Sequence, residues 1–266
     1  MYMGIFDALS GGGVSNEPNF CEYSETFSDQ PVRITCDTNF AASLPCTAIP
    51  YCVKIQIQVY PDPSNPDLIS DAELNHITTV RSILGQHLDG RFVGQGIVAS
   101  ANMAFLIFYI PERRAKSAGK MLEESFSNAF RHTEYTIQLD PEGTQYMEYL
   151  FPNAIQLKQV ENNKILRKLR GYGDDGSTPR PIKFHFVFPN RKAALEFSAE
   201  ASEKEFAYED LTQEAAPEGM VLPRYHLVLS RTLPFNIELL DLVDGYLLEL
   251  CEGYEATYRS LETDVI

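Results

Sequence analysis

The segment VKIQIQVY, at residues 53–60, alternates apolar and polar side chains along its length. One face carries Val53, Ile55, Ile57 and Val59, and the other carries Lys54, Gln56, Gln58 and Tyr60. This period of two is typical of a strand with one buried face. The residues on either side of this strand decide which fold it joins.

Downstream of this strand, the pattern changes to helical spacing. Ser70-Asp71-Ala72-Glu73 has the form of a capping box, and apolar residues then recur at helical intervals up to Leu88. Residues 92–99 and 104–110 predict two strands, Pro111 begins a helix that extends to Ala129, and residues 135–139 alternate again. The succession strand–helix–strand–strand–helix–strand is typical of a ferredoxin-like fold.

A similar succession begins again in the second half of the chain. Residues 182–188 predict a strand, a helix follows Asn190, residues 206–211 and 225–229 predict two more strands, and Asn236 caps a helix that reaches Tyr254. We therefore expect an α+β protein with two ferredoxin-like α/β sandwiches in tandem, each with an antiparallel sheet covered on one face by helices.

The predicted domain boundaries follow from these patterns. Residues 1–19, which include Gly11-Gly12-Gly13, predict a flexible N-terminal segment. Residues 20–176 form the predicted first domain, in which residues 31–36 add a strand and residues 140–176 form a helical connector that ends in a glycine-rich turn. The predicted second domain spans residues 177–266.

The composition limits the classes of partner. The 266 residues include 37 acidic and 22 basic side chains, which gives a net charge of -15. This charge disfavours direct binding to nucleic acid or to an anionic membrane and suits a basic protein partner. The longest apolar run, residues 103–111, is shorter than the roughly 20 residues of a membrane-spanning helix. Five cysteines without an export signal predict free thiols and a cytoplasmic location.

We find no motif for catalysis, a cofactor or a metal. The chain lacks Gly-x-Ser-x-Gly, and its five histidines are scattered. Gly94-Gln95-Gly96 lacks the third glycine of a dinucleotide-binding loop and lies in a predicted strand, so it predicts a bulge or kink. Asp174 and Asp175 fit either a tight turn or a site for a hard cation. We expect a protein that is not an enzyme, with no cofactor and no metal.

Specific strings in the sequence resemble known families. They are Tyr23, Gln30-Pro31-Val32, Asp37, Pro50, Asp140-Pro141-Glu142, Tyr146, Leu150-Phe151-Pro152, Leu169, Gly173-Asp174-Asp175, Pro179-Arg180-Pro181, His185 and Phe188. Together they resemble an uncharacterised bacterial domain family that is often fused to a domain similar to RraB, the regulator of ribonuclease E activity. Gly253, Tyr258, Glu262 and Thr263 resemble the RraB-like ending, although Ser260-Leu261 replaces its Gly-Trp and Gly143 replaces a common Trp of the first family.

The leading functional hypothesis is a non-catalytic protein-interaction or regulatory protein. The resemblance implies a link to the inhibition of ribonuclease E, with a basic protein such as a ribonuclease as the partner. The predicted contact surface comprises His226, Tyr258, Glu262 and Thr263, together with His185 on the neighbouring strand. An alternative reading of Tyr258 is that its ring only packs against the end of the last helix.

A second hypothesis places a small-molecule, metal or enzymatic site in a groove between the domains. The residues predicted for it are Asp174, Asp175, Arg180 and His185, because aspartate, arginine and histidine side chains that converge in a cleft can bind an anion or a metal. The alternative reading is an Asp–Arg ion pair that locks the two domains together. Association of two copies through a sheet face or edge stays open at this point.

Overall fold

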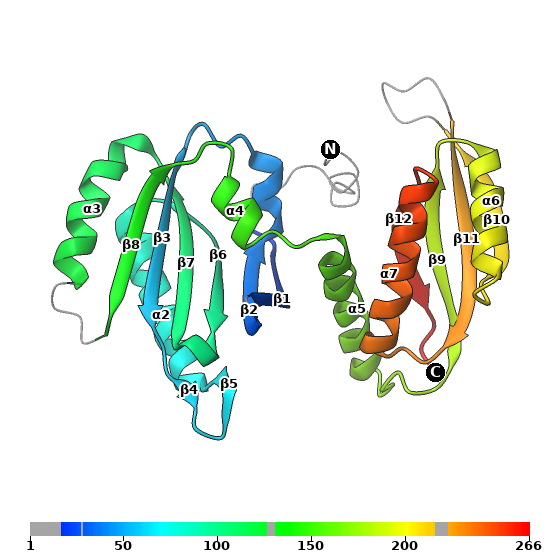
Figure 1. Cartoon of the computed structure of the whole chain (residues 1–266), viewed down its shortest axis with the longest axis horizontal. Helices are drawn as coiled ribbons and strands as arrows, with labels where there is room; N and C mark the ends of the chain where they lie inside the picture. The colour runs from blue at the N-terminus through cyan, green and yellow to red at the C-terminus, as the bar shows by residue number, and fades with distance from the viewer. Residues whose placement is uncertain (1–16, 28, 127–130, 216–222) are drawn as a thin grey trace. The chain divides into compact units, whose positions relative to one another are not determined.

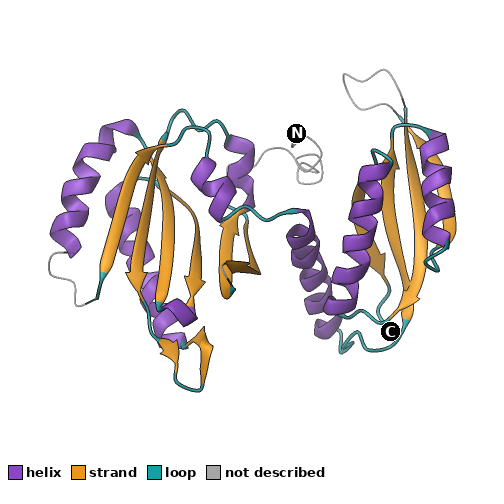
Figure 2. Ribbon diagram, viewed as in Figure 1, coloured by secondary structure: helices purple, strands orange, loops and turns teal. Residues whose placement is uncertain are grey.

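The computed structural model describes residues 17–27, 29–126, 131–215 and 223–266 (Figures 1 and 2). The chain divides between Pro152 and Asn153 into two compact units. We call residues 17–152 the first unit and residues 153–266 the second unit. Among the described residues, no helix has the length and apolar character needed to cross a membrane.

The first unit is built on a six-stranded antiparallel sheet with the strand order β1-β2-β6-β7-β3-β8. Its elements are β1 (Phe20–Phe27), β2 (Gln30–Asp37), η1 (Thr38–Ser43), β3 (Tyr51–Gln58), β4 (Pro61–Asp62), β5 (Asn65–Ile69), α2 (Asp71–Leu88), β6 (Arg91–Val98), η2 (Ala99–Ala101), β7 (Met103–Ile110), α3 (Glu112–Phe126), β8 (Thr133–Leu139) and α4 (Thr144–Tyr149). The predicted ferredoxin-like succession is confirmed as β3-α2-β6-β7-α3-β8.

Helices α2 and α3 cover one face of this sheet, over a core that includes Ile55, Leu84, Phe108 and Leu122. Ser70 caps α2 as predicted, because its side chain accepts a hydrogen bond from the Glu73 amide. The opposite face is partly covered by η1 and α4, which pack Phe40 and Tyr146 around Tyr109 of β7. The predicted end of α3 at Ala129 lies outside the described residues.

The strand predicted at residues 31–36 is confirmed as β2, whereas the sequence missed β1, β4 and β5. The pair β1 and β2 extends the ferredoxin-like sheet beyond β6, and β4 and β5 form a small hairpin between β3 and α2. The predicted irregularity at Gly94-Gln95-Gly96 is confirmed, because the pairing of β6 with β7 shifts register between Phe92 and Gly94.

The second unit has a four-stranded antiparallel sheet with the strand order β10-β11-β9-β12. Its elements are α5 (Ala154–Gly171), β9 (Arg180–Phe188), α6 (Arg191–Ser202), β10 (Ala207–Glu214), β11 (Arg224–Leu233), α7 (Ile237–Gly253) and β12 (Thr257–Thr263). The sequence predicted β9 through α7 but not β12. This last strand completes the ferredoxin-like succession, and it lies beside β9 at an edge of the sheet.

The structure differs from the predicted domain boundary at residues 176 and 177. Leu166 and Leu169 of α5 belong to the core of the second unit, and α5 packs along α7. The helix that the sequence assigned to the first domain is therefore part of the second unit. The physical reason is that its buried side chains find their apolar partners among the residues that follow it.

Candidate functional site

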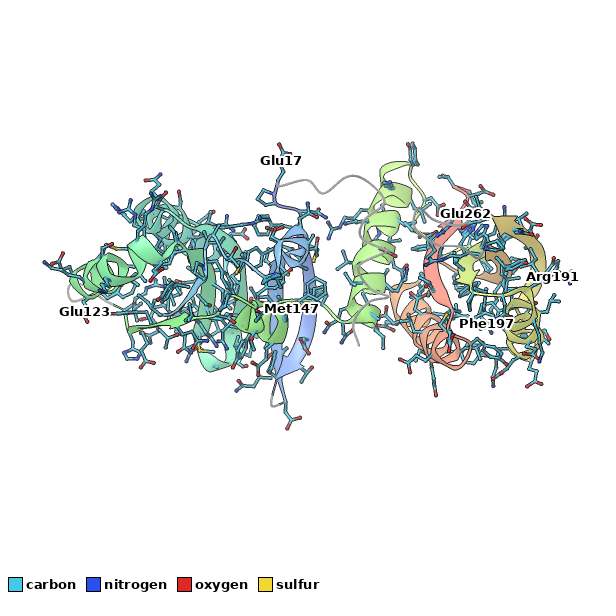
Figure 3. The ribbon with its side chains drawn as sticks, turned by 90° about the horizontal axis from the view of Figure 1, so that it is seen from above. Glu17, Glu123, Met147, Arg191, Phe197 and Glu262 are labelled. Carbon is cyan, nitrogen blue, oxygen red and sulfur yellow. The ribbon has the colours of Figure 1, made fainter. Side chains whose placement is uncertain are left out.

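Among the described residues of the second unit, helices cover only one face of the sheet. Phe184, Phe186 and Phe188 of β9 point into the core under α6 and α7, so the alternating residues Lys183 and His185 lie on the outer face. On β12, Glu262 pairs with Lys183 and lies on the same outer face. Phe197 of α6 lies on the opposite side of the sheet (Figure 3). We call the outward-facing residues of this sheet the outer sheet face.

His185 and His226 meet on the outer sheet face, as the sequence predicted for neighbouring strands. Nδ1 of His185 lies 3.1 Å from Nε2 of His226, and the two rings stack with an interplanar angle of 9°. Burial lowers the pKa of His185, while Glu262, with Oε1 3.5 Å from Nε2 of His185, opposes this effect. The uncharged form of His185 is therefore favoured at neutral pH.

Two ion pairs flank the histidines. Lys183 pairs with Glu262 at 3.5 Å, and Arg259 of β12 makes hydrogen bonds of 2.9 and 3.1 Å to both carboxylate oxygens of Glu214 on β10. The second pair spans the sheet, because β10 and β12 are its two edge strands. Hydrogen bonding to Arg259 lowers the pKa of Glu214, so this carboxylate stays ionised.

Tyr258 does not lie on the outer sheet face. It is only 4% exposed, its ring packs against Phe184 and Phe186, and its hydroxyl donates a 2.7 Å hydrogen bond to Asp244 of α7. Tyr258 is thus buried, as in the alternative reading, but its hydroxyl meets the middle of α7 rather than the end of that helix. The Thr263 hydroxyl, at the end of β12, donates a hydrogen bond to the carbonyl of Pro181. Of Tyr258, Glu262 and Thr263, only Glu262 presents a largely exposed charged side chain.

The sequence did not predict the polar network around Asp244. The Asp244 carboxylate accepts hydrogen bonds from Tyr258 and from Nδ2 of Asn162 on α5, each at 2.7 Å. Lys158 of α5 lies over the Tyr258 ring and donates to the carbonyl of Arg259. Burial raises the pKa of Asp244, and its two hydrogen-bond donors counteract this rise. The only signal in the sequence was helical spacing, which places Lys158, Asn162 and Leu166 on one face of α5.

Asp174 and Arg180 form an ion pair inside the second unit. Arg180 is 1% exposed, and both of its terminal nitrogens bond the Asp174 carboxylate. Asp174 also accepts from the amides of Gly176 and Ile266, and Arg180 donates to the carbonyls of Thr178 and Asp264. Hydrogen bonding to Arg180 holds the pKa of Asp174 well below its ordinary value. The pair fixes the turn before β9 to the residues after β12.

The other two residues predicted beside this pair lie apart from it. Asp175 is exposed, and its carboxylate accepts a hydrogen bond from the Ser177 amide, which is a turn interaction. His185 faces His226 and Glu262 instead. Within the described ranges, no group of three or more His, Cys, Asp and Glu side chains is arranged to hold a metal ion.

In the first unit, several residues from the strings that resemble a known family make buried hydrogen bonds. Asp140 accepts hydrogen bonds from the Tyr109 hydroxyl and from the amides of Thr144 and Gln145, so it anchors the start of α4. Tyr146 donates to the carbonyl of Asp37, and Tyr23 donates to the carbonyl of Leu150. These residues join β1, β2, β7 and α4 through buried hydrogen bonds.

Two solved structures illustrate what this chain is similar to. An unknown protein from Galdieria sulphuraria is 9% identical, with a TM-score of 0.24, and the match covers 81% of this chain and 97% of that chain. A putative glycine cleavage system transcriptional repressor is 9% identical, with a TM-score of 0.25 and coverage of 81% and 98%. At these TM-scores neither similarity supports an argument. A comparison with curated proteins finds no significant match.

Two sequence families match consecutive parts of the chain. Residues 19–151 match a family of unknown function, DUF695, and residues 159–263 match RraB, regulator of ribonuclease activity B. The strings from Leu169 to Phe188, which were predicted to belong to the first family, fall within the RraB match instead. The chain therefore belongs to the DUF695 family, and the DUF695 domain is followed by an RraB domain.

Proposed function

We propose that this chain is a non-catalytic regulatory protein whose outer sheet face, in the second unit, docks a protein partner connected with ribonuclease activity. The observation that carries this proposal is the RraB match, which spans all four strands of the second unit and most of α5. Such a domain can regulate a ribonuclease by contact with the enzyme or with a protein bound to it.

The outer sheet face supports docking because it carries polar groups at fixed positions. Lys183 and Glu262 keep side-chain exposures of 50% and 58%, so each can exchange its present partner for an opposite charge on another protein. Arg259 and Glu214 add a second pair at the edges of the same sheet. Exposed ion pairs of this kind contribute more to partner choice and association rate than to the stability of the fold.

The overall charge of -15 further suits a partner with a basic docking segment. The Asp174–Arg180 pair does not favour the alternative of a ligand groove, because the two side chains already satisfy one another and the surrounding backbone. We therefore propose the docking function alone.

A charge-exchange experiment tests this proposal. The double variant K183E/E262K keeps a Lys–Glu pair but reverses it on the outer sheet face. The matched control K192E/E196K reverses a pair of the same 3.5 Å separation on α6. The tagged full-length variants are compared in capture of the native ribonuclease and its associated proteins, at low and moderate salt, and in an RNA-cleavage assay.

We expect the wild type and the α6 control to capture the partner and to change the cleavage rate. The sheet variant should bind at least about tenfold more weakly, which corresponds to ~1.4 kcal/mol. Equal capture by the wild type, the sheet variant and the α6 control would show that the outer sheet face is not the docking surface. If the wild type neither binds a ribonuclease complex nor changes RNA cleavage, the proposed function is wrong.

A further inference from the structure

The cross-strand pair of His185 and His226 is the starting point for an inference that does not depend on the docking function. The two residues lie 41 positions apart in sequence, on the adjacent strands β9 and β11. Their nearest ring nitrogens are 3.1 Å apart and face one another. His185 is 17% exposed and His226 is partly exposed, so water reaches the rings.

Glu262 favours one of the two neutral tautomers of His185. Its carboxylate lies beside Nε2 of His185 and favours a proton on that nitrogen, which leaves the lone pair on Nδ1. That lone pair is directed toward Nε2 of His226. A carboxylate on the outer nitrogen of a histidine is the arrangement that orients histidine ligands in metal sites and makes them more basic.

We propose that His185 and His226 together bind a late first-row divalent transition ion, such as Zn²⁺, Ni²⁺ or Cu²⁺, with water completing the coordination. Imidazole nitrogen suits these ions, whereas Mg²⁺ and Ca²⁺ prefer oxygen. With the nitrogens at their present separation, an ion about 2.0–2.1 Å from both would make a nitrogen–metal–nitrogen angle of roughly 100°. This angle lies between the square-planar and tetrahedral values, and a rotation of the two rings would direct both lone pairs at the ion.

The chain's other soft ligands are poor competitors for the ion. All five cysteines are buried, and none forms a disulfide. Burial raises the pKa of Cys46 to about 11 and those of Cys52 and Cys251 to about 12, and it also raises that of Cys36. Because only the thiolate binds metals well, these side chains stay unreactive in the folded protein. The imidazole pair is therefore the better site.

The test is a metal titration of the full-length chain, purified without a histidine tag and stripped with a chelator. Competition titrations with Zn²⁺, Ni²⁺ and Cu²⁺ measure affinity and stoichiometry for the wild type, H185Q, H226Q, E262Q and the control H87Q, which changes an exposed histidine of α2. Circular dichroism checks the fold of each variant. The ring resonances of the wild type, followed by NMR, identify the ligands without any substitution.

We expect one ion per chain, at least tenfold weaker binding by H185Q and by H226Q, a smaller loss for E262Q and no change for H87Q. The ring signals of His185 and His226 should shift or broaden until one equivalent is added. The proposal is overturned if none of the three ions binds saturably, or if the two ring signals stay in place while metal binds elsewhere. Loss of metal binding with intact partner capture, or the reverse, separates this inference from the docking function.

Discussion

Two tyrosine hydroxyls of the second unit meet carboxylates at the same distance but in different surroundings. Tyr258 donates to Asp244 at 2.7 Å in the core, and Tyr254 donates to Glu200 at 2.7 Å on the surface. A hydrogen bond to a buried charge contributes more than an exposed one, because the buried carboxylate has no water to replace the lost donor. The pair therefore gives an internal comparison at the scale of single residues.

We predict that Y258F lowers the free energy of unfolding of the second unit by about 1.5–3 kcal/mol, the usual contribution of a hydrogen bond to a charged group. Urea denaturation followed by circular dichroism measures this change. The control Y254F should unfold close to the wild-type midpoint, because Glu200 is solvated. Equal effects from the two substitutions would contradict a special role for the buried hydroxyl.

The candidate site was only partly predictable at the residue scale. Adjacent placement of His185 and His226 followed from alternation in two strands and from the ferredoxin-like order. The sequence left open whether Tyr258 is buried or part of a contact surface, because β12 has a bulge between Tyr258 and Ser260. The bulge keeps Tyr258 and Leu261 in the core and breaks the period of two from which strands are read.

At the scale of a single element, two glycines of strand β6 allow the neighbouring strands to approach its backbone closely. A Cβ at Gly96 would overlap the ring of Phe105 on β7, and a Cβ at Gly94 would overlap the carbonyl of Thr35 on β2. The sequence suggested a strand irregularity rather than a phosphate-binding loop at this point. The structure gives the reason, because both neighbouring strands fill the space that a side chain would need.

We predict that G96A destabilises the first unit by about 1–3 kcal/mol, the usual cost of overpacking a core. The matched control is G119A in α3, where a Cβ would meet only Tyr135 and Ile137 at 3.8 and 3.9 Å. Alanine there should be neutral or stabilising by up to about 1 kcal/mol. Thermal and urea unfolding of both variants provides the comparison, and a G96A protein as stable as wild type would refute the proposed clash.

At the scale of the whole molecule, the division into units follows core formation rather than the sequence pattern of the connector. Helix α5 contributes Leu166 and Leu169 to the second core and joins Asn162 to Asp244. Because much of its surface is polar, the sequence predicted α5 as part of a connector between two domains. Its buried face makes it part of the second unit.

We predict that a fragment of residues 153–266 folds cooperatively, whereas a fragment of residues 177–266 is largely unfolded. The shorter fragment lacks two buried leucines, each worth about 2–5 kcal/mol, against a typical domain stability of 5–15 kcal/mol. Circular dichroism and thermal melting of the two fragments measure the difference. Similar melting curves would place α5 outside the cooperative unit and restore the boundary predicted from the sequence.

The sequence by itself determined the α+β class and the order of most helices and strands, because side-chain alternation and helix capping are local properties. Tertiary structure decided which distant residues meet. It placed β12 beside β9 and brought Arg259 of β12 to Glu214 of β10 across the sheet. These contacts depend on strand register and on bulges, which are set by pairing between segments far apart in the chain.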